Sequence, residues 1–235
     1  MRVALAAVGL ACLVLFPTAL HAQAIGNPVF SGYDFVLQAT VEYGSSDRDL
    51  DAGRKKAEES QVDTTLLKLV LGLHPRVDLY LMIGTVSFDL CTGDAQEICE
   101  QDGELSGASD LAYGGGARWT FWDGERVAAA VGVSTLLFSV SDEIQNTDLS
   151  VDWWEYEFFA GASFPIFRHA TPYLGMSYSV VDAQLDGPNS VDLEADESFG
   201  VFVGLDVPLG NYFSLTAEGR FLDQTAWSVG LNARY

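Results

Sequence analysis

The sequence is poor in basic residues: its 235 residues include 12 Lys and Arg against 33 Asp and Glu, a formal net charge of −21. Such a surface repels the phosphates of nucleic acids, so we expect no nucleic-acid partner. It suits cations, strong solvation and cationic partners instead.

Long apolar runs are also scarce. One runs from Val3 to Leu20, follows a basic start and precedes the small-residue site Ala22-Gln23-Ala24. This order predicts a secretory signal peptide over 1–24, cut after Ala24, and a mature domain over 25–235. The alternatives are a cut after Ala22, an uncleaved membrane helix and lipidation of Cys12. Beyond Ala24 no run is long enough for a membrane helix, so any later crossing must use strands.

Cysteine is rare too. Without the signal peptide the cysteines are Cys91 and Cys99, which lie close together in a polar segment. Export places them in an oxidising compartment, which favours a local disulfide over a metal site or a reactive thiol.

From Tyr33 onward the chain shows an alternation of apolar and polar residues with a period of two. This pattern predicts one all-β domain, an antiparallel up-and-down transmembrane β-barrel of about ten strands, with eight as the alternative. The expected strands are 33–44, 62–74, 77–89, 109–121, 126–139, 151–163, 170–182, 195–207, 212–222 and 225–235. Tight turns with Pro and Gly alternate with longer polar loops near 45–61, 90–108, 140–150 and 183–194. This layout places both termini on the periplasmic side.

The apolar face of these strands is predicted to face lipid. A soluble barrel of lipocalin type, with the apolar face inside, is the alternative. Aromatic residues gather at both ends of the strands, among them Tyr173 at the periplasmic rim and Trp153 at the outer rim. Two such girdles match the two interfaces of a membrane. Both faces of 77–89 and of 126–139 are apolar, so the facing of these two strands stays open.

Charges within the strands are predicted to point into the lumen, because Arg or Lys facing lipid at the midplane costs about 2–4 kcal/mol. Unpaired buried charge is expensive, so acids and bases there should form an ion-pair network. The predicted members are Asp34, Glu42, Lys68, Arg118, Glu155, Glu157, Asp206, Glu218, Arg220 and Arg234. Side chains can fill a barrel of this size, so we expect a filled lumen in preference to a narrow channel for small hydrophilic solutes.

The C-terminal segment has a polar residue, a glycine and alternating apolar positions before a last aromatic residue. It resembles the assembly signal of outer-membrane barrels at Ser228, Gly230, Ala233 and Tyr235. With the signal peptide and the girdles, the mature chain resembles the small outer-membrane barrel family of OmpA/OmpX type. The resemblance implies the outer membrane of a Gram-negative bacterium, contact with membrane lipid and lipopolysaccharide, and handling by the barrel assembly machinery. It leaves oligomeric state and activity open, because one fold hosts many functions.

The predicted loops are acidic. Asp47, Asp49, Asp51 and Glu58 have part of the spacing of a calcium loop, but Ala52 stands where glycine is required, so no metal site is predicted. The acid-rich loops near 89–110 and 182–197 would hold divalent cations only diffusely, bridging lipopolysaccharide phosphates, or would serve ordinary solvation.

Catalysis finds little support in the sequence. The barrel enzymes that this chain might resemble depend on a histidine at the extracellular rim. His74 and His169 both fall in predicted periplasmic turns. We therefore expect no enzyme and no cofactor, and a role in envelope structure or surface interaction.

The last two strands also predict their own register. The inward residues are even-numbered in both strands, so the residue numbers of two directly opposed residues must add to an even number. The loop between the strands must then contain an odd number of residues. The expected loop is 223–225, which sets Arg220 against Ser228 and Glu218 against Gly230.

Overall fold

The computed structural model describes residues 25–28, 37–52, 55–90, 110–144, 147–165, 170–186, 190–195 and 198–235. Its strands are β1 (Leu37–Ala52), β2 (Lys55–His74), β3 (Val77–Leu90), β4 (Asp110–Asp123), β5 (Ala128–Ile144), β6 (Thr147–Ser163), β7 (Thr171–Asp186), β8 (Val191–Ala195), β9 (Phe199–Pro208), β10 (Phe213–Phe221) and β11 (Thr225–Arg234). No helix in these ranges is long and apolar enough to cross a membrane.

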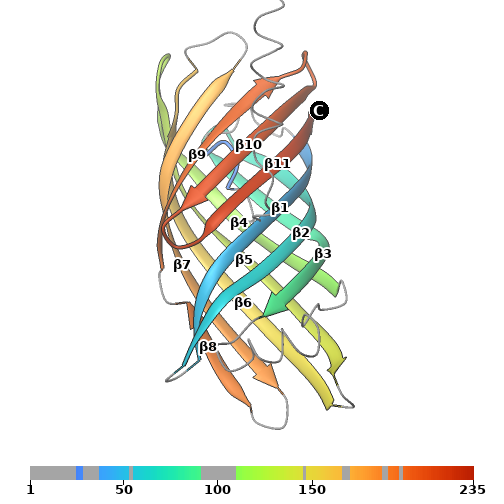
Figure 1. Ribbon diagram of the computed structural model, residues 1–235. Coiled ribbons are helices and arrows are strands. Elements are labelled where there is room, and N and C mark those ends of the chain that lie inside the picture. Colours follow the sequence, from blue (N-terminus) through green and yellow to red (C-terminus); the bar gives the residue numbers. More distant parts are fainter. Residues whose placement is uncertain are drawn as a thin grey trace, which may run out of the picture.

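The strands form one antiparallel sheet that closes where β11 pairs with β1 (Figure 1). Ten of the eleven strands make the ring, in chain order except that β9 follows β7. The predicted ten-stranded up-and-down barrel is confirmed. Tight turns join strands at the end that carries Tyr235, which we call the turn end, and we call the opposite end the loop end (Figure 1).

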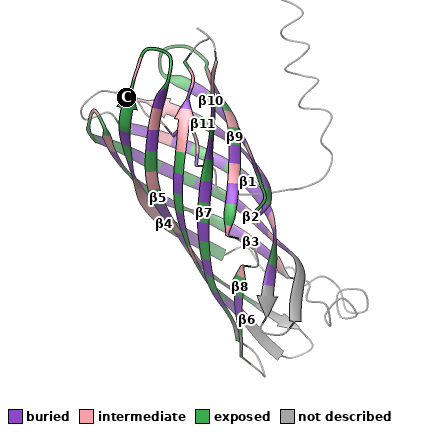
Figure 2. Ribbon diagram, turned by 90° about the vertical axis from the view of Figure 1, so that its left-hand side faces the viewer, coloured by how far each residue is buried: buried purple, intermediate pink, exposed green. Residues whose placement is uncertain are grey.

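Buried and exposed residues alternate along the strands, as the coloured bands in Figure 2 show. In β10 the even-numbered residues are buried and the odd-numbered residues are outside, as the period-two pattern requires. The same rule settles the two strands whose facing the sequence left open. Even-numbered residues face inward in β3 and in β5.

Two predicted loops are strands instead. The segments 45–61 and 140–150 belong largely to the hairpins β1–β2 and β5–β6, whose pairing continues to Ala52↔Lys55 and Ile144↔Thr147. Polar composition suggested loops, but a hairpin needs only backbone partners, and polar side chains are compatible with it outside a membrane. The predicted loop 90–108 lies almost wholly outside the described residues.

The strand predicted over 195–207 is divided. Its main part is β9, whereas the short β8 lies in a predicted loop and pairs with both β7 and β1. Glu194 of β8 pairs with Asp182 of β7 on one side and with Asp51 of β1 on the other, so β8 lies between β7 and β1. Because β9, β10 and β11 stop short of the loop end, β8 completes the wall there by pairing with β7 and β1 (Figure 1).

The register of the last hairpin was predicted in part. The loop is Leu222–Gln224, and its odd count and the even sums are confirmed, but the pairs are Glu218↔Ser228 and Arg220↔Ala226. The prediction was wrong by two residues. The reason is Asp223, which the prediction placed at the edge of the loop. Asp223 instead lies at the tip of the β10–β11 loop with its side chain buried, and Leu222 adopts a φ of 88° to turn the chain.

Candidate functional site

The outer surface of the barrel is a band of exposed apolar side chains. Aliphatic residues such as Leu69, Leu81 and Ile83 are 42–71% exposed in the strands. Exposed aromatic residues include Trp119, Phe121 and Phe213 toward the turn end, Phe199 and Phe221 at the opposite ends of β9 and β10, and Tyr43 and Trp154 within the long strands β1 and β6. This is the surface that hydrocarbon with two aromatic interfaces favours. Two predicted girdle residues were wrong, because Tyr173 and Trp153 are each only 2% exposed and lie inside the barrel.

The lumen is occupied near the turn end by the chain's own N-terminal segment, Ile25–Pro28. The amides of Ile25 and Gly26 donate to the two carboxylate oxygens of Glu218, at 3.0 and 2.9 Å. Lys68 Nζ donates to the Ile25 carbonyl at 3.4 Å, and Arg118 Nη1 donates to the Asn27 carbonyl at 2.7 Å. Side chains from β2, β4 and β10 thus hold this segment by its backbone.

Side-chain packing holds the same segment. Ile25 joins an apolar cluster with Phe159, Tyr173 and Phe202, and its own exposure is 5%. The ring of Tyr173 lies across Gly204, where any side chain would overlap it. Its hydroxyl donates to Glu218 at 3.1 Å. The missing side chain of Gly204 therefore makes room for the ring that supports Ile25.

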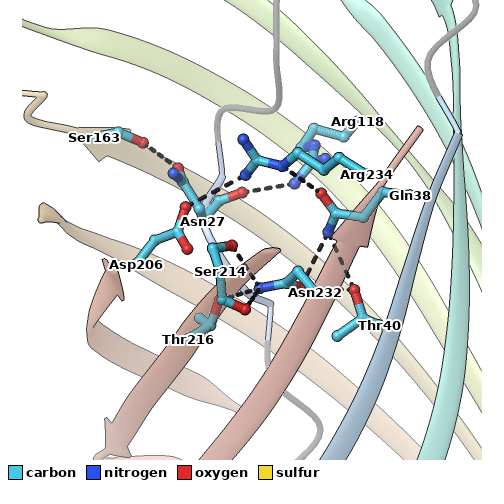
Figure 3. Close-up of polar contacts among 10 residues, drawn as sticks. All are labelled: Asn27, Gln38, Thr40, Arg118, Ser163, Asp206, Ser214, Thr216, Asn232 and Arg234. Atoms are coloured by element: carbon cyan, nitrogen blue, oxygen red, sulfur yellow. Dashed lines mark hydrogen bonds and ion pairs between the residues drawn. The ribbon is translucent and has the colours of Figure 1, made fainter. Parts of the chain in front are cut away.

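Around this segment the lumen wall is polar (Figure 3). Arg118 Nε pairs with Asp78 at 3.0 Å, and Ser163 Oγ donates to Asn27 Oδ1 at 2.5 Å. Arg234 lies at the seam, where Nη2 pairs with Asp206 at 3.4 Å and Nε donates to Gln38 Oε1 at 3.1 Å. The pairs Arg118–Asp78 and Arg234–Gln38 link neighbouring strands, the pair Arg234–Asp206 reaches from β11 across β10 to β9, and Ser163 fixes the N-terminal segment to β6.

Asn232 links the three strands at the closing seam. Its Nδ2 donates to Thr216 Oγ1 at 2.7 Å and to Ser214 Oγ at 3.1 Å on β10. Its Oδ1 accepts from Thr40 Oγ1 at 2.7 Å and from Gln38 Nε2 at 3.1 Å on β1 (Figure 3). One amide therefore fastens β11 to both neighbours.

Replacing Asn232 with alanine should lower the free energy of unfolding by about 1–3 kcal/mol, because buried donors and acceptors on β1 and β10 lose their partner. Urea unfolding in detergent, followed by the heat-dependent gel shift of the barrel, measures the loss. Asn211→Ala in the exposed β9–β10 turn is the matched control, with little change expected. Equal midpoints for the two variants would contradict the role of Asn232.

A central ion cluster lies farther toward the loop end. Arg220, 2% exposed, pairs with Glu157 and donates to Ser177 Oγ at 3.0 Å. Arg48 Nη2 pairs with Glu155 at 3.1 Å and with Asp223 at 3.7 Å. Burial raises the pKa of Asp223, which lies in the turn after β10, and the neighbouring Arg220 and Arg48 oppose that shift.

The loop end of the lumen is apolar. Phe88, Phe138 and Trp153 form an aromatic cluster, with ring centroids 5.5–6.2 Å apart and the Phe138 and Trp153 rings stacked at 11°. Buried aliphatic residues surround it, contributed by Leu50, Val62, Leu66, Val86, Leu136, Val140, Val151, Val181 and Leu193. A hydrophobic core therefore closes this end of the barrel.

Little space remains between these layers. One internal cavity of about 40 Å³ is lined by the N-terminal segment and the polar wall, and another of about 20 Å³ lies beside Arg48, Arg220 and Trp153. A water needs about 10–15 Å³ on this measure. The two cavities thus hold a few waters and no larger solute.

A closed barrel with an apolar exterior and a polar, ion-paired interior wall satisfies every requirement of strands in a bilayer. The protein is a transmembrane β-barrel. No protein-family model matches the sequence, and no curated protein matches it.

Several solved structures are similar to this barrel. The transport unit of the autotransporter AIDA-I from Escherichia coli has 12% identity and a TM-score of 0.48, over 94% of each chain. An outer membrane channel from Pseudomonas putida F1 has 12% identity and a TM-score of 0.47, over 94% of this chain and 100% of that one. The outer membrane protease OmpT from Escherichia coli has 9% identity and a TM-score of 0.46, over 91% and 99%. At such identities none of them assigns an activity to this barrel.

Most of the predicted lumen charges lie inside the barrel. Those that are buried are Glu42, Lys68, Arg118, Glu157, Asp206, Glu218 and Arg220. Glu155 and Arg234 have side-chain exposures of 16% and 37%. Asp34 is outside the described residues, as are Cys91 and Cys99 and therefore the predicted disulfide. In the predicted assembly signal, Ser228 and Gly230 are buried, Ala233 is half-buried and Tyr235 is 92% exposed.

Three buried charges were missed in the sequence. Arg48 fell in a predicted loop, Asp78 in a strand of open facing and Asp223 in a turn. Asp78 had a usable signal, because the even-number rule of the neighbouring strands extends to it. The calcium-loop residues Asp47, Asp49 and Asp51 belong to strand β1, and the described residues contain no group of three or more potential metal ligands. His74 is exposed at the turn end, and His169 is outside the described residues.

Proposed function

We propose that this outer-membrane barrel serves envelope structure or surface interaction, with a lumen closed to solutes. The observation that carries the proposal is that three groups of residues, one after another, fill the lumen along its length. The N-terminal segment, the central ion cluster and the aromatic cluster follow one another from the turn end to the loop end. Between them the described residues line small cavities of about 40 and 20 Å³.

The loop end supplies the surface for interaction. Exposed acids project there from the long hairpins and from β8: Asp49, Asp110, Asp152, Asp182, Asp186, Asp192 and Glu194. Among the side chains described at this end, the one base is Arg48, which is buried. We propose that this acidic rim attracts divalent cations diffusely and so bridges lipopolysaccharide phosphates. Lipid contact along the apolar band and insertion by the barrel assembly machinery belong to the same proposal.

Conductance in planar lipid bilayers tests the closed lumen. The folded barrel, with its insertion verified by the heat-dependent gel shift, should give no discrete current steps under conditions in which a general porin conducts. Reproducible steps would instead support the narrow channel and overturn the closed lumen. The proposal includes no catalysis, and release of fatty acid from lipid by the purified barrel would contradict that part.

A further inference from the structure

Ile25 is held by every group that it offers. Its side chain packs against Phe159, Tyr173 and Phe202, and its carbonyl accepts from Lys68. Its nitrogen lies 3.0 Å from Glu218 Oε1. The side chain, the carbonyl and the nitrogen of Ile25 therefore all have specific contacts. Ile25 is also the residue that directly follows the predicted cleavage site at Ala24.

The partner of that nitrogen is a buried acid. Glu218 is 4% exposed, and its hydrogen-bond donors among the described residues are the Ile25 and Gly26 amides and the Tyr173 hydroxyl, all neutral. Lys68 interacts with Glu218 through charge alone, since its ammonium group donates to the Ile25 carbonyl instead. A buried carboxylate is costly unless a positive charge or several strong donors compensate it. A cation in place of the Ile25 amide would supply both the charge and the stronger hydrogen bond.

We propose that a signal peptidase cuts between Ala24 and Ile25 and that Glu218 then binds the new α-ammonium group of Ile25 as a buried ion pair. Hydrolysis consumes one water and breaks the peptide bond, which leaves a carboxylate on Ala24 and an ammonium group on Ile25. The barrel thereby holds its own processed N terminus. Cleavage after Ala22 would leave an amide at Ile25 and no such pair. The pairing is independent of whether the lumen conducts.

The full precursor, expressed in a Gram-negative host and purified from its outer membrane, tests this inference. Intact-mass spectrometry should give a chain that begins at Ile25. Acetylation of the folded barrel by an N-hydroxysuccinimide ester should then modify the α-amine about tenfold or more slowly than in the heat-unfolded chain, because reaction requires local opening. A first residue other than Ile25, or equal rates in the two states, would overturn the proposal.

Matched variants separate the ion pair from general burial. Glu218→Gln should remove most of the protection of the α-amine, whereas Asp206→Asn, which changes the carboxylate that pairs with Arg234, should preserve it. A recombinant barrel that begins at Ala24, one residue before Ile25, should expose its α-amine to the reagent. Each variant is compared as the heat-modifiable, folded species. Undiminished protection in folded Glu218→Gln would contradict the role of Glu218.

Discussion

Replacing Arg220 with methionine is expected to lower the free energy of unfolding by about 3–5 kcal/mol, the cost of breaking a buried ion pair from one side. Arg220 is among the largest fully buried side chains, and its guanidinium pairs with Glu157 and contacts Ser177. Methionine keeps much of the length and volume and removes the charge. The buried acids around it, Glu157 and Asp223, then lose a positive neighbour.

Guanidinium unfolding in detergent, followed by far-ultraviolet circular dichroism, measures this loss. Arg126→Met is the matched control, because Arg126 is exposed in the turn before β5 and should change the midpoint little. Adding Glu157→Gln to Arg220→Met should restore part of the stability, since the abandoned carboxylate disappears. If Arg220→Met and Arg126→Met unfold at the same denaturant concentration, the central ion cluster does not stabilise the barrel.

The barrel itself could be predicted because its lipid face and its lumen face differ. In β10 and β11 polar and apolar residues alternate without exception over most of each strand, and a one-residue slip would place the whole apolar set inside. The same difference located most of the ion network, since charge is excluded from the lipid face.

The aromatic cluster could not be predicted by this reasoning. In β3 and β5 the lipid face and the lumen face are both apolar near the loop end, where Phe88 and Phe138 point inward. Hydrophobic patterning records burial from water and does not distinguish lipid from a protein core. The same ambiguity led to Trp153 being assigned to a membrane interface.

The place of the N-terminal segment was also beyond the sequence. Ile25–Pro28 is too short to show a period, and its partners Lys68, Arg118 and Glu218 come from strands scattered through the chain. The sequence predicted that these charges face inward and in pairs. It could not indicate that Lys68 and Arg118 donate to backbone carbonyls of this segment, or that Glu218 accepts from two of its amides. Those contacts follow from closure of the ring.

Trp153 and its neighbour Trp154 allow the filled lumen to be tested within one strand. Trp153 is 2% exposed and stacks on Phe138, whereas Trp154 is 51% exposed on the lipid face. Trp153→Ala should cost about 3–5 kcal/mol, because it leaves a cavity in a packed core. Trp154→Ala leaves no cavity and should cost clearly less.

Far-ultraviolet circular dichroism in guanidinium, with the folded fraction checked by the heat-dependent gel shift, compares the two variants. Trp153→Phe adds a second comparison. Within the described part of the chain the Trp153 indole N–H has no hydrogen-bond acceptor, so phenylalanine removes a buried unsatisfied donor and retains a ring for stacking. It should therefore lose much less stability than Trp153→Ala. If Trp153→Ala loses no more stability than Trp154→Ala, the loop end of the lumen is not a packed core. The aromatic cluster then does not close the lumen.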